Sequence, residues 1–530
     1  MLIRGVTRVF PLIALVTLVT FFAFAKFKRN SLLNSWTFGY GGLAKDVVTP
    51  FIHSPDPLES DPDRVWDNGN IHDGSRLDLE KIPLPDLSSV QPSPQSQHQP
   101  ELLGSEWQST PDNTHNEIFS VSTPSRKYFD ILFGEHETLN PNIIPHPSSN
   151  NKWIIVAQQK NRDLQNGKKS LVSIQLVCDA AFDTSDKNDG QSASSSASFT
   201  DNSGETLACV TQPTILPISA TSSEDRCQGR WSMLAANIGP HDARVFYGPD
   251  IPYTIYGSNS QYTCFGQWMH DFRMLVDWKS PSNEIATSFD VEKSPNVFHT
   301  ATELYRPIPL GEVEKNWFIF WDAAGEAYVH YDVWPKRSFA KIEKNDYSIL
   351  DESSPVSITV GPDLSILPST SDTRCMDKYM PVVPDNSKEF IHQATNSLSI
   401  TLCKRSEAGC LATDQNTFIF TIFQKKTDVG FGASSYEPYV MLFRRTLPFD
   451  LHSISTKPFW IHGRKAAQKN EMKPEMMYVT SMSWKNHGQT YHGYSDDVLF
   501  LAFGIDDSRT AGIDIVAGDL LRDMGICMNV

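Results

Sequence analysis

From Trp153 onward the chain is a succession of short apolar or alternating segments separated by turn residues. These segments are rich in aromatic and β-branched side chains, which is typical of half-buried strands. No long segment shows the apolar stripe of an amphipathic helix. Examples are Arg244-Val-Phe-Tyr, Trp317-Phe-Ile-Phe-Trp, Phe418-Ile-Phe-Thr-Ile-Phe and Val498-Leu-Phe-Leu-Ala-Phe. The pattern predicts an all-β fold.

The length of this region limits the choice of all-β architecture. A single β-sandwich uses roughly 100 residues, whereas a β-propeller adds four-stranded blades around an axis and absorbs a longer chain. We therefore expect one propeller over residues 126–530, with a Ser-rich low-complexity insertion at 183–204. No WD or kelch repeat is recognisable, so the blades are expected to be degenerate.

Composition and charge exclude two other classes of protein. Hydrophobic residues make up 40% of the 530 residues, enough for a packed core and against disorder of the whole chain. The formal net charge is −16, which argues against a basic sleeve for nucleic acid. Net charge does not describe a single pocket, so a basic site within an acidic surface is still compatible with it.

The N-terminus predicts a membrane anchor. Residues 9–25 carry no charge and are followed by Lys26, Lys28 and Arg29. We expect a cytoplasmic tail at 1–8, a signal-anchor at 9–25 and a Pro/Ser-rich, disordered stem at 26–125. These features indicate a single-pass type II protein of the Golgi or another secretory-pathway membrane. The alternative is a cleaved signal peptide ending at Ala23-Phe-Ala25.

The cysteines bear on the same question. The chain has eight, an even number, and no Cys-x-x-Cys, which disfavours zinc-ribbon and thioredoxin-type chemistry. In an oxidising lumen, Cys403 and Cys410 could close a short loop, and Cys209 and Cys227 a larger one. The alternative is a set of buried free thiols.

A first polar cluster surrounds a Gly-Pro turn. Asp242 and Arg244 follow this turn at the start of a predicted strand, and side chains two residues apart share one face. Such a pair can hold a sugar hydroxyl and supply a proton. The alternative is a structural Asp–Arg ion pair. Asp271 lies in a related segment, Gly266–Arg273, further along the chain.

A second cluster looks like a hairpin with two cations at its start. Arg306 and Lys315-Asn316 precede one predicted strand, and His330-Tyr331 lie on the return strand. Two cations and an imidazole suit a phosphate or pyrophosphate group. Trp317, Trp321 and Trp334 could pack against sugar rings. The alternative is strand-end charges with core tryptophans.

A third cluster brackets an apolar strand near the C-terminus. His492 and Asp496-Asp497 precede the strand, and Asp506-Asp507 follow it. We consider His492 and Asp497 as sugar-binding candidates. Carboxylates at strand ends can also bind a divalent metal, but they are more often turn formers and strand gatekeepers, so no metal site is predicted. No Gly-rich phosphate loop or Gly-x-Ser-x-Gly elbow is present.

Taken in order, the three clusters resemble the five-bladed β-propeller family of β-mannoside phosphorylases and eukaryotic β-1,2-mannosyltransferases. The family's Glu-Asp-Pro-Arg strand start matches His241-Asp242-Ala243-Arg244, and its late Gly-x-x-Asp matches Gly504–Asp507. The resemblance spans roughly residues 225–525. His241 and Ala243 depart from the pattern. An anchored stem is foreign to cytosolic phosphorylases and similar to the anchors of fungal Golgi β-mannosyltransferases.

The resemblance implies an inverting glycosyltransferase that adds a mannose-type sugar in β linkage to a glycan acceptor. The donor is a nucleotide sugar or a sugar phosphate, and no other cofactor is implied. Alternatives are a glycoside hydrolase on the same propeller and a non-catalytic glycan-binding protein. By resemblance, Asp242 is the acid/base, Arg244 and Asp271 position the sugar, and Arg306, Lys315, Asn316, His330 and Tyr331 hold the phosphate.

Overall fold

The computed structural model describes residues 113–160, 172–182, 206–222, 226–236, 238–276, 297–307, 309–343, 347–348, 356–385, 387–430, 433–467 and 473–529. All of them lie in the compact unit Leu102–Val530. The predicted tail, anchor, insertion and stem up to residue 112 lie outside the described residues. Within the described part of the chain, no helix has the length and apolar character needed to span a bilayer.

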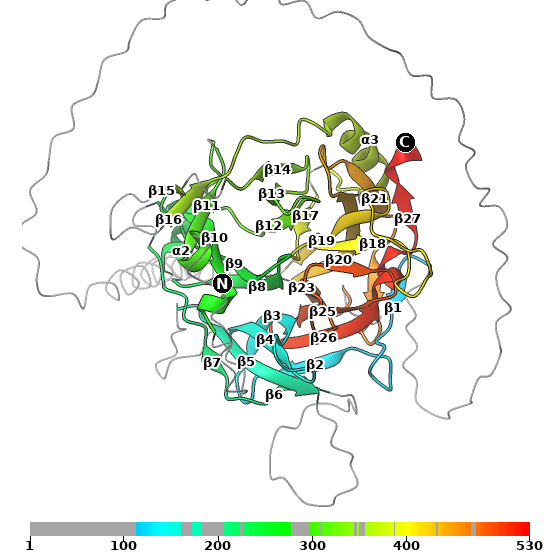
Figure 1. Cartoon of the computed structure of the whole chain (residues 1–530). Coiled ribbons are helices and arrows are strands. Elements are labelled where there is room, and N and C mark those ends of the chain that lie inside the picture. The colour runs from blue at the N-terminus through cyan, green and yellow to red at the C-terminus, as the bar shows by residue number, and fades with distance from the viewer. Residues whose placement is uncertain are drawn as a thin grey trace, which may run out of the picture. The chain divides into compact units, whose positions relative to one another are not determined.

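The described residues are mostly strands, as the sequence pattern predicts (Figure 1). A nine-stranded sheet has the order β23 (Met477–Trp484), β25 (Val498–Ile505), β26 (Arg509–Val516), β2 (Phe129–Leu132), β6 (Leu207–Cys209), β5 (Gln175–Phe182), β4 (Trp153–Gln159), β3 (Thr138–Pro145), with β7 (Thr214–Ile215) paired to β5. A six-stranded sheet has the order β15 (Tyr347–Ser348), β16 (Val356–Thr359), β11 (Thr302–Tyr305), β10 (Phe265–Asp271), β9 (Pro252–Asn259), β8 (His241–Tyr247).

The remaining strands form three further sheets. A seven-stranded sheet has the order β24 (His492–Tyr494), β18 (Leu398–Thr401), β19 (Thr417–Gly430), β20 (Ala433–Arg444), β21 (Leu451–Ser455), β27 (Met524–Ile526), with β17 (Glu389–Gln393) paired to β19. A three-stranded sheet contains β12 (Phe318–Trp321), β13 (Ala327–Asp332) and β14 (Ser338–Lys341), and β1 (Asn116–Ile118) pairs with β22 (Phe459–Ile461). The helices are short: η1 (Gly229–Trp231), α2 (Ser232–Ala236), η2 (Phe272–Met274), η3 (Val297–His299), α3 (Ser369–Tyr379), η4 (Ala517–Leu521) and η5 (Cys527–Asn529).

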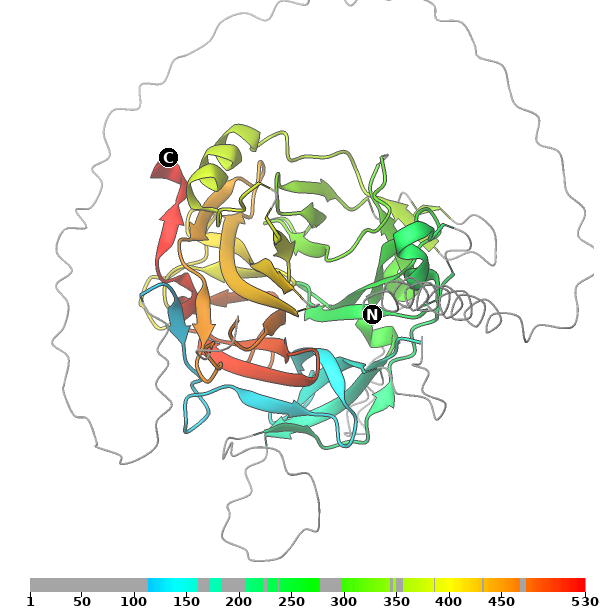
Figure 2. The same cartoon turned by 180° about the vertical axis from the view of Figure 1, so that it is seen from behind.

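The larger sheets are arranged around a common centre (Figures 1 and 2). Strands β3, β8 and β23 lie side by side near this centre, although they come from distant parts of the chain. One hydrophobic cluster joins the four larger sheets, with Phe246, Ile319, Phe420 and Leu501 all buried in it. The fold is therefore all-β with a shared core.

Side-chain amides join neighbouring sheets near the centre. Asn142 on β3 donates to the carbonyl of Ala243 (2.9 Å) and accepts from the amide of Val245 (3.0 Å). Asn396, just before β18, binds both the amide and the carbonyl of Met482 at 3.0 Å. A carboxamide offers one donor and one acceptor side, like a peptide group, so it can replace a strand partner where two sheets diverge.

The folded part begins before residue 126, where the sequence analysis ended the stem. Residues 116–118 form β1, which pairs in parallel with β22. The Ser120 hydroxyl donates to the buried Asp514 carboxylate (2.5 Å), which also binds the Lys485 ammonium (2.6 Å). The predicted boundary is therefore wrong: residues 113–125 pack on the sheets, because their polar side chains meet partners that lie far along the chain.

All eight cysteines form disulfides within the described residues: Cys178–Cys209, Cys227–Cys264, Cys375–Cys527 and Cys403–Cys410. The short Cys403–Cys410 loop is confirmed, whereas the suggested Cys209–Cys227 pair and the free-thiol alternative are wrong. Strand β6 lies antiparallel to β5 with Cys209 opposite Ala180, so Cys178 is a diagonal neighbour on the same face.

Candidate functional site

Asp242 begins the site at the start of β8. Its φ of 50° and a register shift between His241 and Arg244 set this residue outside the regular ladder. Its amide donates to Gln158 Oε1 (2.9 Å), and its Oδ1 accepts from Asn140 Nδ2 (2.5 Å). The side chain is exposed. The backbone is thus held by the next sheet while the carboxylate faces open space.

We call this space the Asp242 pocket. It is a small, partly open hollow lined by His241, Asp242, Arg244, Ile255, Gly257, Phe265, Gln267, Lys315, Asn316, Trp317 and Ala394. The lining residues come from β8, β9 and β10, from the segment just before β12 and from the residue just after β17. Four predicted site residues, Asp242, Arg244, Lys315 and Asn316, are therefore brought together.

Arg244 supports the pocket rather than neutralising Asp242. It is buried; its Nε donates to the carbonyl of Ala394 (3.0 Å) and its Nη1 to the carbonyl of Asp242 (2.5 Å). Among the described ion pairs there is none between the Asp242 carboxylate and Arg244. The ion-pair alternative is therefore wrong, because the guanidinium is used to hold backbone from two sheets.

One side of the centre is cationic. Lys315 is exposed in the Asp242 pocket, and Asn316 beside it has a φ of 63°. Burial lowers the pKa of His392 on β17 to about 4, and the nearby ammonium groups of Lys315 and Lys426 contribute to this shift. Asp428 opposes this shift. His392 is therefore a neutral imidazole between two cations at neutral pH.

A second group of residues near Asp242 is acidic and aromatic. Partial burial first, and then the Asp242 carboxylate, raise the pKa of Asp507 in the β25–β26 turn. Burial raises the pKa of Tyr478, whose hydroxyl is hydrogen-bonded to Arg244. The Tyr478 ring packs edge to face on Tyr436, with centroids 4.9 Å apart. Asp507, noted in the sequence as a turn residue, thus lies close to the predicted acid/base.

The structure does not bring Arg306 to the Asp242 pocket as a phosphate ligand. Its Nε and Nη2 donate to both oxygens of Glu314 (2.8 and 2.6 Å), and its Nη1 donates to Asp332 (2.9 Å). The guanidinium also lies over the buried ring of Tyr331, 5.0 Å from its centroid. Two carboxylates and an aromatic face already satisfy this cation, and neither Arg306 nor Tyr331 lines the pocket.

His330 is also in the core. It is fully buried, stacked on Phe318 at 4.6 Å, and hydrogen-bonded to Gln393 and Arg337. Burial, and then the charge of Arg337, hold the pKa of His330 well below its usual value. Of the residues to which the resemblance gives an acid/base or phosphate-binding role, Asp242, Lys315 and Asn316 line the pocket, and Arg306, His330 and Tyr331 do not. Trp317 and Trp321 are buried, as the alternative of core tryptophans predicts, whereas Trp334 is exposed.

Asp271 is a structural residue at the end of β10. Its side chain is fully buried and accepts hydrogen bonds from the Arg273 amide and Nε (both 3.0 Å) and from Arg273 Nη2 (2.7 Å). It does not line the Asp242 pocket. The predicted sugar-positioning role of Asp271 is therefore replaced by a local ion pair that ends the strand.

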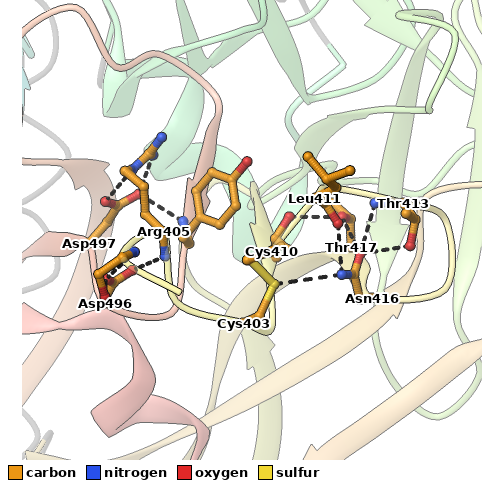
Figure 3. The surroundings of a disulfide bond; sticks show 12 residues. Cys403, Arg405, Cys410, Leu411, Thr413, Asn416, Thr417, Asp496 and Asp497 are labelled. Carbon is orange, nitrogen blue, oxygen red and sulfur yellow. Dashed lines mark hydrogen bonds and ion pairs between the residues drawn. A yellow bond between two sulfur atoms is a disulfide. The ribbon is translucent and has the colours of Figure 1, made fainter. Parts of the chain in front are cut away.

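Asp497 lies at another place, beside the Cys403–Cys410 loop (Figure 3). His492 is near the same loop, because it pairs with Ser399 on β18. Arg405 in this loop binds both oxygens of Asp497 (3.0 and 2.6 Å), and Asp496 accepts from the Arg405 amide (2.6 Å). His492 Nε2 is hydrogen-bonded to Thr401 (2.8 Å). These residues fasten a disulfide loop and do not line the Asp242 pocket, so the structure does not bring these two sugar-binding candidates to Asp242.

The sequence analysis missed Asn140, Gln158, His392, Lys426 and Tyr478. None stands in a recognisable motif, and each reaches the centre through contacts between sheets. The alternation of β19 places Gln424, Lys426 and Asp428 on one face, but only the fold shows which face meets the centre. The described residues contain no group of three or more His, Cys, Asp or Glu placed to hold a metal ion.

No protein-family model and no curated protein matches this sequence. The solved structures to which the chain is similar include a β-1,2-mannobiose phosphorylase from Listeria innocua (9% identity, TM-score 0.35, 74% of this chain and 93% of that one). They also include a mannose phosphorylase from Leishmania mexicana (11%, 0.34, 73% and 88%) and a glycosyl hydrolase from Bacteroides ovatus (11%, 0.30, 76% and 92%). All three are named as sugar-processing enzymes.

Proposed function

We propose that this chain is a glycosyltransferase that adds a mannose-type sugar in β linkage to a glycan hydroxyl, with Asp242 as the acid/base. The observation that carries the proposal is that an exposed carboxylate and an exposed ammonium, Asp242 and Lys315, line one pocket. Glycosyl transfer from a phosphate-bearing donor needs a group that handles the acceptor proton and a cation that stabilises the leaving phosphate.

The cationic residues near Asp242 indicate a donor that carries a phosphate. Lys315, His392 and Lys426 would bind the donor phosphate in place of Arg306, His330 and Tyr331, and Lys426 would do so while its ammonium is paired with the partly exposed Asp428 (3.0 Å). The ammonium groups of Lys315 and Lys426 lower the pKa of His392. A bound anion would reduce this repulsion and favour the protonated imidazole, which could then donate a hydrogen bond to the phosphate. The donor would be a nucleotide sugar or a sugar phosphate.

The strand order supports five blades. The nine-stranded sheet divides at the parallel pair β2–β6 into two antiparallel groups, β23-β25-β26-β2 and β3-β4-β5-β6. The six-stranded sheet leaves the group β8-β9-β10-β11 at its parallel pair β11–β16. With β18-β19-β20-β21 and β12-β13-β14, five antiparallel groups surround the centre.

The disulfides support a secretory compartment. Every cysteine of the chain is paired, which requires oxidising conditions during folding. Together with the uncharged stretch at residues 9–25, this supports a type II protein of a Golgi or related membrane. A reporter fused after residue 112, before the first described residues of the folded part, should then lie in a protease-protected compartment, and a cytosolic reporter would contradict this placement.

A donor screen tests the activity. Purified full-length protein is offered nucleotide sugars and mannose 1-phosphate with an oligomannoside acceptor, and the products are read by mass. We expect one hexose to be added, and Asp242→Asn to lower kcat by roughly 10²–10⁴. Asp250→Asn, an exposed carboxylate in the β8–β9 turn outside the pocket, is the control and should keep full activity. Full activity of Asp242→Asn would refute the assignment.

Hydrolysis is the second candidate, because Asp507 lies close enough to Asp242 for the two carboxylates to repel. A hydrolase uses two carboxylates and needs no phosphate clamp. It would release free sugar from an oligomannoside without any donor, and Asp507→Asn would abolish this release. Binding of the oligomannoside without turnover under either condition would favour a non-catalytic glycan-binding protein.

A further inference from the structure

The peptide group between Asn316 and Trp317 is held from both sides by glutamine side chains. Gln393 Nε2 on β17 donates to the carbonyl of Asn316 (2.9 Å). The amide of Trp317 donates to Gln267 Oε1 on β10 (2.9 Å). The two glutamines belong to two different sheets, and both are nearly inaccessible to solvent. We call this arrangement the glutamine clamp.

We propose that Gln267 and Gln393 are positioning residues that fix Lys315 in the Asp242 pocket for the phosphate of the donor. This inference rests on the proposed function for what Lys315 binds, but not for how Lys315 is held.

The backbone explains why a clamp is needed. Strand β12 begins only at Phe318, so the residues before it have no strand ladder to hold them. Asn316 has a φ of 63°, a left-handed conformation that asparagine adopts more readily than most residues with a side chain, so the sequence permits this turn and the two glutamines hold its peptide group. Lys315 is long and exposed, so the direction in which its ammonium points depends on this backbone.

The orientation of Gln393 is itself determined by the core. Arg337 Nε donates to His330 Nε2 (3.2 Å), so the proton of the neutral imidazole is on Nδ1. Nδ1–H then donates to Gln393 Oε1, which turns the Gln393 amide nitrogen toward the carbonyls of Asn316 (2.9 Å) and His330 (3.2 Å). His330 therefore acts on the pocket through Gln393.

Arg337 is fixed in turn. Its Nη1 binds Asp372 (2.6 Å) and the carbonyl of Phe449 (2.9 Å). A continuous chain of hydrogen bonds thus runs from α3 through Arg337, His330 and Gln393 to the wall of the pocket. Burial keeps the pKa of His330 well below the working range, so this orientation does not change between neutral and mildly acidic pH.

The test compares Gln267→Met and Gln393→Met with Asn396→Leu in the full-length protein. Asn396 is the matched control, since its buried amide also binds one amide and one carbonyl of a neighbouring sheet but does not line the pocket. Binding of inorganic pyrophosphate is measured by calorimetry, together with KM for the donor and the melting temperature. We expect both glutamine variants to bind pyrophosphate roughly tenfold more weakly and to raise KM for the donor, and kcat should fall as well, because Lys315 also stabilises the leaving phosphate.

A second readout does not depend on activity. When Gln267→Met releases the peptide, the Lys315 ammonium should move from His392, and the NMR titration of His392 should shift upward from about 4. Asn396→Leu should leave both this titration and pyrophosphate binding within twofold of the wild type. Equal loss in all three variants, or unchanged binding and unchanged titration in the glutamine variants, would overturn the proposal. If the wild type binds no anion, the proposed function fails, and the His392 titration still decides whether the clamp holds Lys315.

Discussion

Removing the Cys375–Cys527 disulfide is expected to destabilise the protein far more than removing Cys403–Cys410. The first bond joins α3 to the C-terminal η5 across 152 residues, and the second closes a loop of 7. The entropy that a cross-link removes from the unfolded chain grows with the logarithm of loop length. At 25 °C this relation gives about 5.1 kcal/mol for the long loop and about 2.4 kcal/mol for the short one. Cys178–Cys209, with a separation of 31, is expected between them at about 3.7 kcal/mol.

Double Cys→Ala variants of each pair are unfolded in urea and followed by the fluorescence of the 12 tryptophans. Alanine is preferred because Cys375 is fully buried in an apolar cluster, where a serine hydroxyl would add its own cost. The loss of unfolding free energy should follow loop length, and the slope of this free energy against urea should rise most for the Cys375–Cys527 variant, because its unfolded chain expands most. If the Cys375–Cys527 variant loses no more stability than the Cys403–Cys410 variant, the loop-entropy reasoning is refuted.

Three further outcomes are expected. Lys315→Met should raise KM for a phosphate-bearing donor. It should also raise the pKa of His392 measured by NMR, because one repelling ammonium group is removed, and an unchanged pKa would show that Lys315 does not lie near His392. Between pH 6.5 and 4, His392 is protonated in the unfolded chain but not in the folded protein, so the free energy of unfolding should decrease as the pH falls through this range. In urea unfolding measured at several pH values, His392→Asn should reduce this dependence on pH. Arg337→Met should cost about 3–5 kcal/mol in urea unfolding, because Asp372 would be buried without its cation; a loss below 1 kcal/mol would contradict that reading.

Much of the fold could be predicted because its signals are local. A period of two in side-chain polarity depends on neighbouring residues alone, so the strands and the all-β class could be read from the sequence. Pro and Gly at turns, the seven-residue spacing of Cys403 and Cys410, and the adjacency of Lys315 to Asn316 are equally local. Residues within one such segment stay together in the structure, as Asp242 and Arg244 do.

Only the tertiary structure decided which segments share a pocket. Arg306 and His330 carry the same chemistry as Lys315 and His392, and the chain alone does not distinguish them. The difference lies in their partners: Glu314 and Asp332 satisfy Arg306, and the core encloses His330, whereas Lys315 faces open space. These partners are chosen by the register between sheets and by how far each strand start reaches toward the centre, and both depend on packing between residues that are distant in sequence.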